Sequence, residues 1–209
     1  ISGVSSPEIS LNVIERNAGG GIKLEAYGYT PFVGVSKRYA TTSPLIMNNR
    51  IFDNGSFAIL GKAMGEYEEG TPGSLNRYGR VKPDLIQNVI AENGGLLSTS
   101  EWYVNSTVEM NFVNNTMCEN GDRLFNVNGG NIMLQNSILW QTEPNNSDYN
   151  TVLKASFCNS DQLLNGEGNI SADPLFKDFA GTDYELNGNS PCIDAGNNQF
   201  IDFDHDFYG

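Results

Sequence analysis

One short pattern recurs along the chain: an asparagine, any residue, a large apolar residue, two further residues, and a second asparagine or glutamine. Five copies read LNVIERN, NRIFDN, QNVIAEN, NNTMCEN and QNSILWQ, and their leading residues are Asn12, Asn49, Asn88, Asn115 and Asn136. A degenerate sixth copy, KASFCNS, has Phe157 in the apolar slot. Successive leading asparagines are 37, 39, 27 and 21 residues apart. Such repeats are typical of proteins whose units bury their apolar faces only by stacking on one another.

The shortest spacings approach the length of one coil of a parallel β-helix. The repeat therefore predicts an all-β fold, a right-handed parallel β-helix whose coils stack about 4.8 Å apart. The apolar slots would form one inward stack: Ile14, Ile51, Ile90, Met117, Ile138 and Phe157. An ordinary β-sandwich with chance matches is the alternative.

Asparagine makes up 27 of the 209 residues, beside 23 glycines, so the chain is rich in residues that tolerate left-handed backbone. We expect the leading asparagines to adopt that conformation and to hydrogen-bond from coil to coil in a ladder. Long apolar stretches with helical periodicity are missing, which disfavours helical bundles and doubly wound α/β folds.

We expect one parallel β-helix domain over residues 1–209. Its coils would cover about 8–160, with long inserts near 18–44 and 55–84, and residues 161–209 would form a closing segment. The inserts would be excursions between strands, where functional residues tend to lie. The domain is interpreted as the C-terminal part of a longer helix, with an open edge on its N-terminal side.

The C-terminal third carries the segments GNIMLQNSILWQ, ISADPLFKD and DYELNGNSPCIDAGNN. These resemble the closing coils of bacterial secreted, pectate-lyase-like parallel β-helix proteins, many of them surface proteins or type IX secretion cargo of Bacteroidota. The resemblance is specific only within 130–197, in the motifs DPLF (173–176) and SPCIDAG (190–196). It implies a structural role for these motifs, no catalytic one, and an extracellular or cell-surface location.

The net charge of −13 excludes a surface that neutralises phosphates, and with it nucleic acid as a partner. No stretch of the sequence has the run of about 18 uncharged apolar residues that a membrane span needs. The charge is uneven, because residues 161–209 contain ten acidic residues and one basic residue.

Three aspartates alternate near the end of the chain, Asp202, Asp204 and Asp206, so an extended segment would present them on one side. Hard cations take carboxylate oxygens, which makes Ca²⁺ the one cofactor suggested, against a solvated acidic loop. His205 is the only histidine and is an unpromising catalytic residue. Cys118, Cys158 and Cys192 lack zinc-site spacing and are expected to be free thiols.

Polysaccharide lyases on this scaffold combine an arginine or lysine base with Ca²⁺-binding carboxylates. Arg50 lies within a predicted coil, near Glu15 and Asp53, and is the candidate base. Trp102, Tyr103 and Trp140 are candidates for a sugar-stacking surface, against the plainer reading of core packing.

The sequence thus favours a secreted or cell-surface module that binds glycans or a surface protein partner without catalysis in this segment. A polysaccharide lyase or glycoside hydrolase acting on acidic polysaccharide is the second hypothesis. A structural subunit of a surface assembly is the third.

Overall fold

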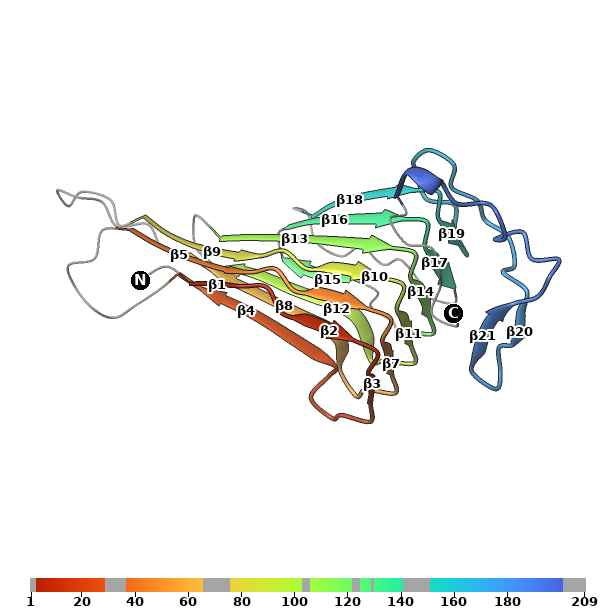
Figure 1. The fold of residues 1–209 in the computed structure, drawn as a ribbon, viewed down its shortest axis with the longest axis horizontal. Coiled ribbons are helices and arrows are strands. Elements are labelled where there is room, and N and C mark those ends of the chain that lie inside the picture. The colour runs from red at the N-terminus through yellow and green to blue at the C-terminus, as the bar shows by residue number, and fades with distance from the viewer. Residues whose placement is uncertain are drawn as a thin grey trace.

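The computed structural model describes residues 3–28, 37–65, 76–102, 106–121, 125–128, 130–140 and 151–200. Its strands form three parallel sheets and one antiparallel hairpin (Figure 1). The nine-stranded long sheet contains β1 (Gly3–Ser5), β2 (Glu8–Ser10), β5 (Lys37–Thr42), β6 (Leu45–Met47), β9 (Asn76–Val81), β10 (Asp84–Ile86), β13 (Ser106–Val113), β16 (Gly130–Gln135) and β18 (Thr151–Ser156). The six-stranded sheet contains β3 (Val13–Glu15), β7 (Arg50–Phe52), β11 (Val89–Ala91), β14 (Thr116–Cys118), β17 (Ile138–Trp140) and β19 (Asn159–Ser160). The four-stranded sheet contains β4 (Ile22–Tyr27), β8 (Phe57–Met64), β12 (Gly95–Trp102) and β15 (Phe125–Asn128).

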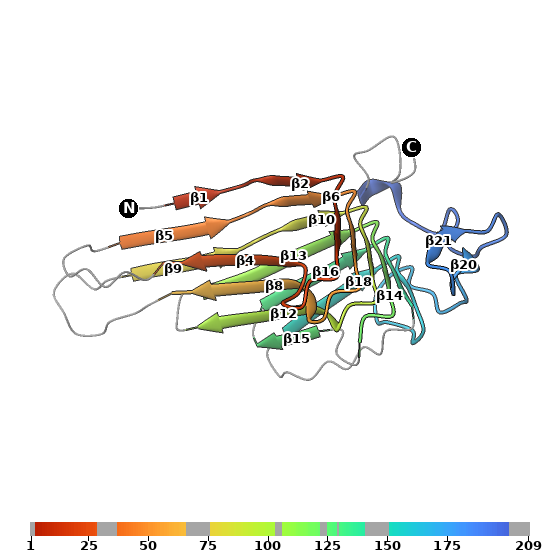
Figure 2. The same cartoon turned by 90° about the horizontal axis from the view of Figure 1, so that it is seen from below.

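The chain passes four times in succession through the long sheet, then the six-stranded sheet, then the four-stranded sheet. We call each such passage a rung. Every strand pairs in parallel with its counterpart in the next rung, as Ile14, Ile51 and Ile90 do. The four-stranded sheet lies opposite the long sheet with its strands running the other way, and the six-stranded sheet joins the two (Figure 2). The expected all-β fold with parallel strands is confirmed at this level. No helix in the described ranges has the length and apolar character needed to cross a bilayer.

Prolines divide the long sheet in the first three rungs. Pro7, Pro44 and Pro83 lie between the paired short strands, where a residue without a backbone N–H interrupts the ladder of hydrogen bonds. Met110 stands opposite Pro83 in the fourth rung, and β13 runs through without a break.

The inserts predicted at 18–44 and 55–84 are largely strands. The first contains β4 and β5 and the second contains β8 and β9, so the prediction that they are excursions between strands is wrong for these residues. The repeat marks only the short six-stranded sheet and its turns. The longer strands of the other two sheets fall between its copies and follow a simple alternation of buried and exposed residues, as in β4.

The core fills the space between the three sheets, in columns that run from rung to rung. The long sheet contributes Ile46, Leu85, Phe112 and Leu134, the six-stranded sheet contributes Ile51, Ile90, Met117 and Leu139, and the four-stranded sheet contributes Ile22, Ile59 and Leu97. The members at 46, 51, 59, 85, 90, 97, 112 and 134 have no exposed surface. Burial of this size, at about 25 cal/mol per Å², is the main stabilising contribution to the stack.

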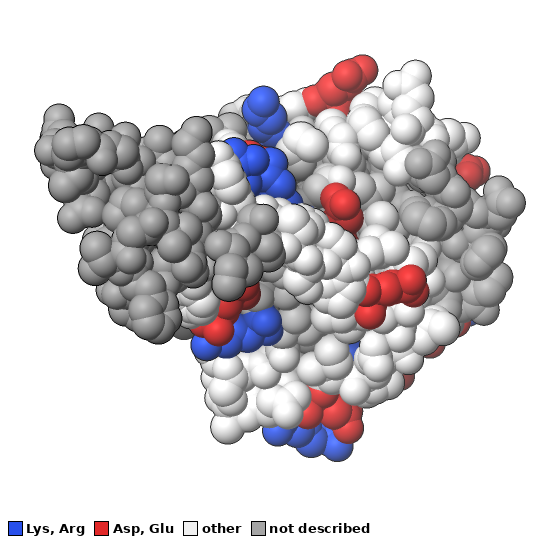
Figure 3. All heavy atoms as spheres, turned by 60° about the vertical axis from the view of Figure 1, so that its left-hand side comes forward, with Lys and Arg blue, Asp and Glu red and all other residues white. Residues whose placement is uncertain are grey.

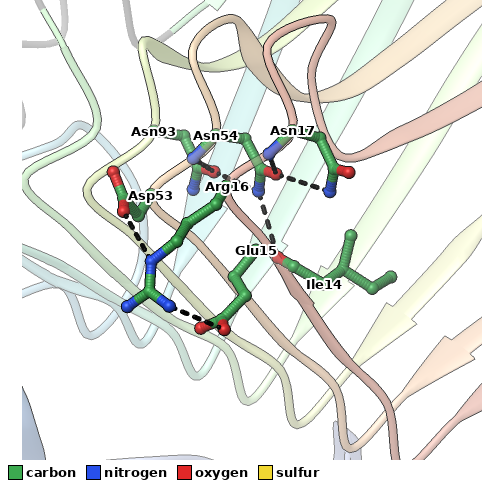
Figure 4. A network of polar contacts seen from close by, with 7 residues as sticks. All are labelled: Ile14, Glu15, Arg16, Asn17, Asp53, Asn54 and Asn93. Atoms are coloured by element: carbon green, nitrogen blue, oxygen red, sulfur yellow. Dashed lines mark hydrogen bonds and ion pairs between the residues drawn. The ribbon is translucent and has the colours of Figure 1, made fainter.

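Two asparagine ladders run across the six-stranded sheet, one just before its strands begin and the other just after they end. In each, the backbone N–H and Nδ2 of one asparagine donate to Oδ1 of the asparagine in the next rung, as from Asn49 to Asn88 at 2.9 and 3.1 Å. The first ladder consists of Asn12, Asn49, Asn88 and Asn115, and the second of Asn17, Asn54, Asn93 and Asn120. Figure 4 shows Asn17, Asn54 and Asn93 side by side.

The expected ladder is confirmed, but its conformation differs from the prediction. The left-handed residue is the one before each asparagine, with φ of 57° at Leu11, 54° at Asn48 and 54° at Gln87. The asparagine itself follows with its side chain turned into the ladder.

The fifth and sixth copies of the repeat are shifted by one residue from the prediction. Asn136 and Phe157 are left-handed residues, with φ of 49° and 53°. Ser137 and Cys158 take the ladder positions: Ser137 Oγ accepts from Asn115 N–H, and Asn169 Oδ1 accepts from Cys158 N–H. Leu139, not Ile138, continues the apolar column, and Ser160 follows it. A short hydroxyl or thiol can fill the slot, so aligning on asparagine alone fails here.

The C-terminal segment covers the last rung and then one outer face. Leu164 packs on the core, and Ile170 bridges to Asn159. The hairpin of β20 (Phe176–Asp178) and β21 (Asp183–Leu186) then lies over the outer side of the six-stranded sheet, followed by the 3-10 turn η1 (Asn198–Phe200). The hairpin and the sheet share a second apolar cluster. Its buried members are Val89, Ala91, Cys118, Phe176 and Tyr184, and Ile138, Trp140, Phe179 and Leu186 pack against them. The hydroxyl of Ser190 donates to the carbonyl of Pro174, which ties the SPCIDAG and DPLF motifs together.

Candidate functional site

A pair of stacked tyrosines stands on the outer side of the long sheet. Tyr39 of β5 and Tyr78 of β9 are partners in register, with ring centroids 4.9 Å apart and planes 4° from parallel. Tyr39 is 42% exposed. The Arg80 guanidinium lies 5.9 Å from the Tyr78 ring centroid, within cation–π range. The pair therefore presents an aromatic surface next to a positive charge.

The two tyrosines face outward because the residues that alternate with them in β5 and β9 face the core. Ala40 packs on the apolar cluster, and Val81 is fully buried. At Gly79 a Cβ would lie 2.4 Å from the carbonyl oxygen of Met64 and 2.5 Å from that of Ala26. The long and four-stranded sheets approach so closely there that only glycine fits.

A cleft of about 640 Å³ with a mixed polar and apolar lining lies on the same outer side, over β10, β13, β16 and β18. One row of its side chains is set by strand register, with Asp84 beside Asn111, Asn111 beside Met133, and Met133 beside Lys154. A second row contains Lys82, Glu109 and Asn131. The two rows thus bring together residues up to 72 positions apart in the sequence.

The cleft combines an ion pair with amide side chains. Lys82 Nζ and the Glu109 carboxylate form a salt bridge, and their side chains are 39% and 42% exposed. Asn111 Nδ2 donates to Asp84 Oδ1 at 3.4 Å. Asn111 Oδ1 is buried and has no hydrogen-bond partner, although a buried acceptor without one is costly.

The stacked tyrosines and the cleft belong to one surface. Tyr78, Arg80, Lys82 and Asp84 occupy alternate positions, and alternate residues of an extended strand point to the same side. At about 3.3 Å per residue, Tyr78 and Lys82 are roughly 13 Å apart along the chain. We call these outward residues the long-sheet face: Tyr39, Tyr78, Arg80, Lys82, Asp84, Glu109, Asn111, Asn131, Met133 and Lys154. Figure 3 shows acidic and basic side chains interspersed with uncharged surface on the side of the molecule that it presents.

Arg50, the candidate lyase base, holds the C-terminal hairpin. Its guanidinium donates to the Thr182 carbonyl at 3.1 Å and to Thr182 Oγ1 at 3.3 Å, and lies 5.1 Å from the Phe52 ring centroid. Glu15 and Asp53, expected near it, both pair instead with Arg16, at 3.1 and 3.4 Å (Figure 4). The arginine and the two carboxylates therefore do not form the predicted group.

The other predicted residues divide between packing positions and undescribed ones. Trp140 is half-buried in the apolar cluster under the hairpin, so it offers no open stacking surface. The Trp102 side chain and Tyr103 lie outside the described residues, as do Asp202, Asp204, Asp206 and His205. Within the described ranges, no group of three or more histidines, cysteines or carboxylates is placed to hold a metal ion.

The three cysteines are free, as expected. Cys118 pairs with Trp140 in the six-stranded sheet, whereas Cys158 occupies a ladder position. Burial raises the pKa of the Cys158 thiol to about 11 and that of Cys118 well above its usual value. Both thiols are therefore protonated at neutral pH and poorly reactive.

A pair of carboxylates lies at the edge of the hairpin. The Tyr184 hydroxyl donates to Glu92 Oε1 at 3.2 Å. Burial, and then the nearby Glu92 carboxylate, raises the pKa of Glu119, while the Tyr184 hydroxyl acts in the opposite direction. Burial is also the main cause that raises the pKa of Tyr184.

Sequence reasoning missed most of the long-sheet face. The repeat pattern marks none of Tyr39, Tyr78 and Lys82. The available signal is the alternation in YGRVKPD, where every second residue from Tyr78 to Asp84 is aromatic or charged. The pairing of Tyr39 with Tyr78 needs the strand register, because the two tyrosines lie in separate repeats.

Comparison of the chain with protein-family models, with curated proteins and with solved structures gives no match. The likeness of the C-terminal motifs to secreted β-helix proteins therefore stays an expectation. A function for the chain has to come from the geometry of the long-sheet face.

Proposed function

We propose that the chain forms a right-handed parallel β-helix. Three observations support this: strands of successive rungs pair in parallel and in register, apolar columns continue through the rungs, and two asparagine ladders run beside them. The right hand is the one that parallel crossover connections adopt in nearly all cases. In such a molecule each face of the stack is a continuous surface made by many rungs.

We further propose that the chain is a secreted or cell-surface module that binds glycans on the long-sheet face. The carrying observation is that this face joins a stacked tyrosine pair, exposed at Tyr39 and half-buried at Tyr78, to a cleft whose lining includes amides and charged groups. Aromatic rings pack on the apolar faces of pyranose rings, and amides and charged side chains hydrogen-bond sugar hydroxyls. The cleft volume falls in the range of ordinary ligand sites.

An oligosaccharide lying along β9 and β10 would reach both parts of this face. One sugar ring would pack on Tyr39, which is 42% exposed. Another would lie in the cleft, with a hydroxyl within reach of the exposed Asn131 amide. Lys154, at the far end of the row, suits a glycan that carries a carboxylate or sulfate there.

The proposal is tested by a glycan array followed by calorimetric titration of the strongest binder, with Ca²⁺ and with a chelator. Truncating both stacked rings, in Tyr39→Ala/Tyr78→Ala, should weaken binding at least about tenfold, equivalent to 1.4 kcal/mol. Asn131→Ala should weaken it as well. Tyr27→Ala is the matched control, because Tyr27 is an exposed tyrosine of similar exposure on the four-stranded sheet.

The absence of any glycan binding would contradict the proposal, as would equal losses in Tyr27→Ala and the double variant. The same samples are assayed for unsaturated uronate products and new reducing ends. Product formation would favour the alternative of a polysaccharide lyase or hydrolase. Loss of that product in Lys82→Ala would place the reaction in the cleft. Loss of the product in Arg50→Ala would instead place the reaction at Arg50, under the hairpin.

A further inference from the structure

Asparagine followed directly by glycine occurs six times in the chain, at Asn54, Asn93, Asn120, Asn128, Asn165 and Asn187. This dipeptide is open to a spontaneous reaction, because glycine has no side chain to keep its backbone nitrogen away from the amide carbon of the preceding asparagine. The reaction converts asparagine into aspartate or isoaspartate without an enzyme. All but the dipeptide at Asn128 lie wholly within the described residues, and their surroundings differ.

Three of these dipeptides belong to the second asparagine ladder, which protects them. Asn54, Asn93 and Asn120 are at most 2% exposed. Their side-chain amides donate to backbone carbonyls, as Asn93 Nδ2 does to the Ile51 carbonyl at 3.0 Å. The nitrogen that would attack is also bound, as Gly94 N–H is to the Asn54 carbonyl at 2.9 Å. The ladder must therefore open locally before these asparagines react.

Asn187 is held in a similar way at the end of the C-terminal hairpin. Its backbone N–H donates to the Leu175 carbonyl at 2.9 Å, and its Nδ2 donates to the Phe176 carbonyl at 3.1 Å. Its own carbonyl accepts from Ser190 N–H at 2.9 Å. Because these bonds fix both the backbone and the amide, turning the side chain toward Gly188 would break the bond to Phe176.

Asn165 is exposed and is not held in this way. Within the described part of the chain, neither its side-chain amide nor the Gly166 N–H has a hydrogen-bond partner. The glycine that follows is required by packing, because its φ is 142° and a Cβ there would collide with the carbonyl oxygen of Ala155 in β18. The fold therefore places a glycine directly after an asparagine whose amide is free to rotate.

The backbone around Asn165 holds residues 164–170, the closing loop, on the stack. Leu164 packs on the core, and its carbonyl accepts from Asn169 Nδ2 at 3.2 Å. The same Nδ2 donates to the Ala155 carbonyl at 3.1 Å, so one amide joins the loop to β18. A longer backbone at Asn165 would strain this loop, whereas a change at the end of the exposed side chain would not.

We propose that Asn165 is a site of spontaneous deamidation, and that its isoaspartate product loosens the closing loop as the folded protein ages. The backbone nitrogen of Gly166 forms a bond to Cγ of Asn165, the Cγ–Nδ2 bond breaks, and ammonia leaves with the proton from that nitrogen. Water then opens the cyclic imide. Opening at Cγ gives aspartate, and opening at the main-chain carbonyl gives isoaspartate, whose backbone is longer by a methylene. The reaction is independent of glycan binding on the long-sheet face.

The first test follows each Asn-Gly peptide by mass spectrometry while the chain is incubated at neutral pH, folded and in urea. The rate in the folded chain is divided by the rate of the same dipeptide in urea, which removes the effect of flanking residues. This ratio should be at least about tenfold higher at Asn165 than at Asn54, Asn93 and Asn120, because local opening costs free energy and 1.4 kcal/mol already slows a reaction tenfold. It should also be higher at Asn165 than at Asn187. A ratio at Asn165 as low as in the ladder would overturn the proposal.

Two variants test the consequence for the closing loop. Freshly prepared Asn165→Asp has the new carboxylate without the longer backbone, so amide exchange over 164–170 should stay as in the original chain. Asn165→Gln is the matched control for ageing, because its longer side chain would have to close a larger ring.

After ageing, the isoaspartate fraction of the original chain should exchange at least about tenfold faster over 164–170, and aged Asn165→Gln should be unchanged. Unchanged exchange in the isoaspartate fraction, or equal loosening in aged Asn165→Gln, would overturn the proposal. Fresh Asn165→Asp that exchanges as fast as the aged chain would assign the effect to charge, contrary to the proposal.

Discussion

At the scale of single residues, the ladders explain why asparagine recurs where aspartate or glutamine does not. The side chain of Asn88 accepts from Asn49 through Oδ1 while its Nδ2 donates to Asn115 and to the Ile46 carbonyl. A carboxylate has no donor, and a longer amide would not reach the same partners. One short amide thus connects a rung to both of its neighbours while being 1% exposed.

Asn88→Ala should lower the free energy of unfolding by about 2–4 kcal/mol, because it leaves several buried donors and acceptors without partners. Asn88→Asp should cost more, since it also buries a charge. Asn12→Ala, at the exposed end of the same ladder, should cost less than about 1 kcal/mol. Urea denaturation of the three variants measures these differences, and equal losses for Asn88→Ala and Asn12→Ala would show that the ladder carries little stability.

At the scale of elements, the C-terminal hairpin is attached to the six-stranded sheet by an apolar cluster and by Arg50. The guanidinium reaches a backbone carbonyl and a hydroxyl of Thr182, 132 residues away in sequence. Arg50 thus acts as an anchor for the hairpin, and its catalytic role stays a prediction.

Arg50→Ala should therefore loosen the hairpin without affecting the long-sheet face. We expect faster amide exchange over 176–186, a stability loss of about 1 kcal/mol for the lost charged hydrogen bonds, and unchanged glycan affinity. Arg16→Ala is the control, because its ion pairs with Glu15 and Asp53 are exposed and contribute little. If hairpin exchange is the same in both variants, Arg50 is not the anchor.

The raised pKa of Glu119 makes hairpin docking depend on pH. The folded state favours the neutral carboxyl, so the contribution of Glu119 is most favourable below its unfolded pKa of 4.5 and declines as pH rises through the higher folded pKa. Glu119→Gln should raise the melting temperature at pH 7, by an amount equivalent to about 0.5 kcal/mol or less given its partial exposure, and have little effect at pH 4. Glu167→Gln, on the exposed closing segment, is the control in calorimetric scans at both pH values. A gain at pH 4 as large as that at pH 7 would contradict the titration.

The elements that the sequence predicts well are those whose signal is local. The slots around Ile14, Ile51, Ile90 and Met117 carry both the apolar residue and the flanking asparagines, so their register is readable. The fifth rung fails because Ser137 replaces asparagine and Asn136 precedes it. The longer strands are not predicted in this way, because the simple alternation in residues such as 22–27 carries no repeat signature.

At the scale of the whole molecule, stacking places distant residues together without any local sequence sign. Tyr39 meets Tyr78, and Asp84, Asn111 and Lys154 line one cleft, only because parallel register carries each rung onto the next. The candidate site could not be read from the sequence for this reason, whereas the class of fold could.

The most direct test of the account is amide hydrogen exchange of the chain with and without the glycan that binds it best. The account predicts slower exchange in peptides covering 76–86 and 106–113 of the long sheet, and unchanged exchange in 22–27 and 57–64 of the four-stranded sheet. Slower exchange in the four-stranded sheet with no change in the long sheet would contradict it.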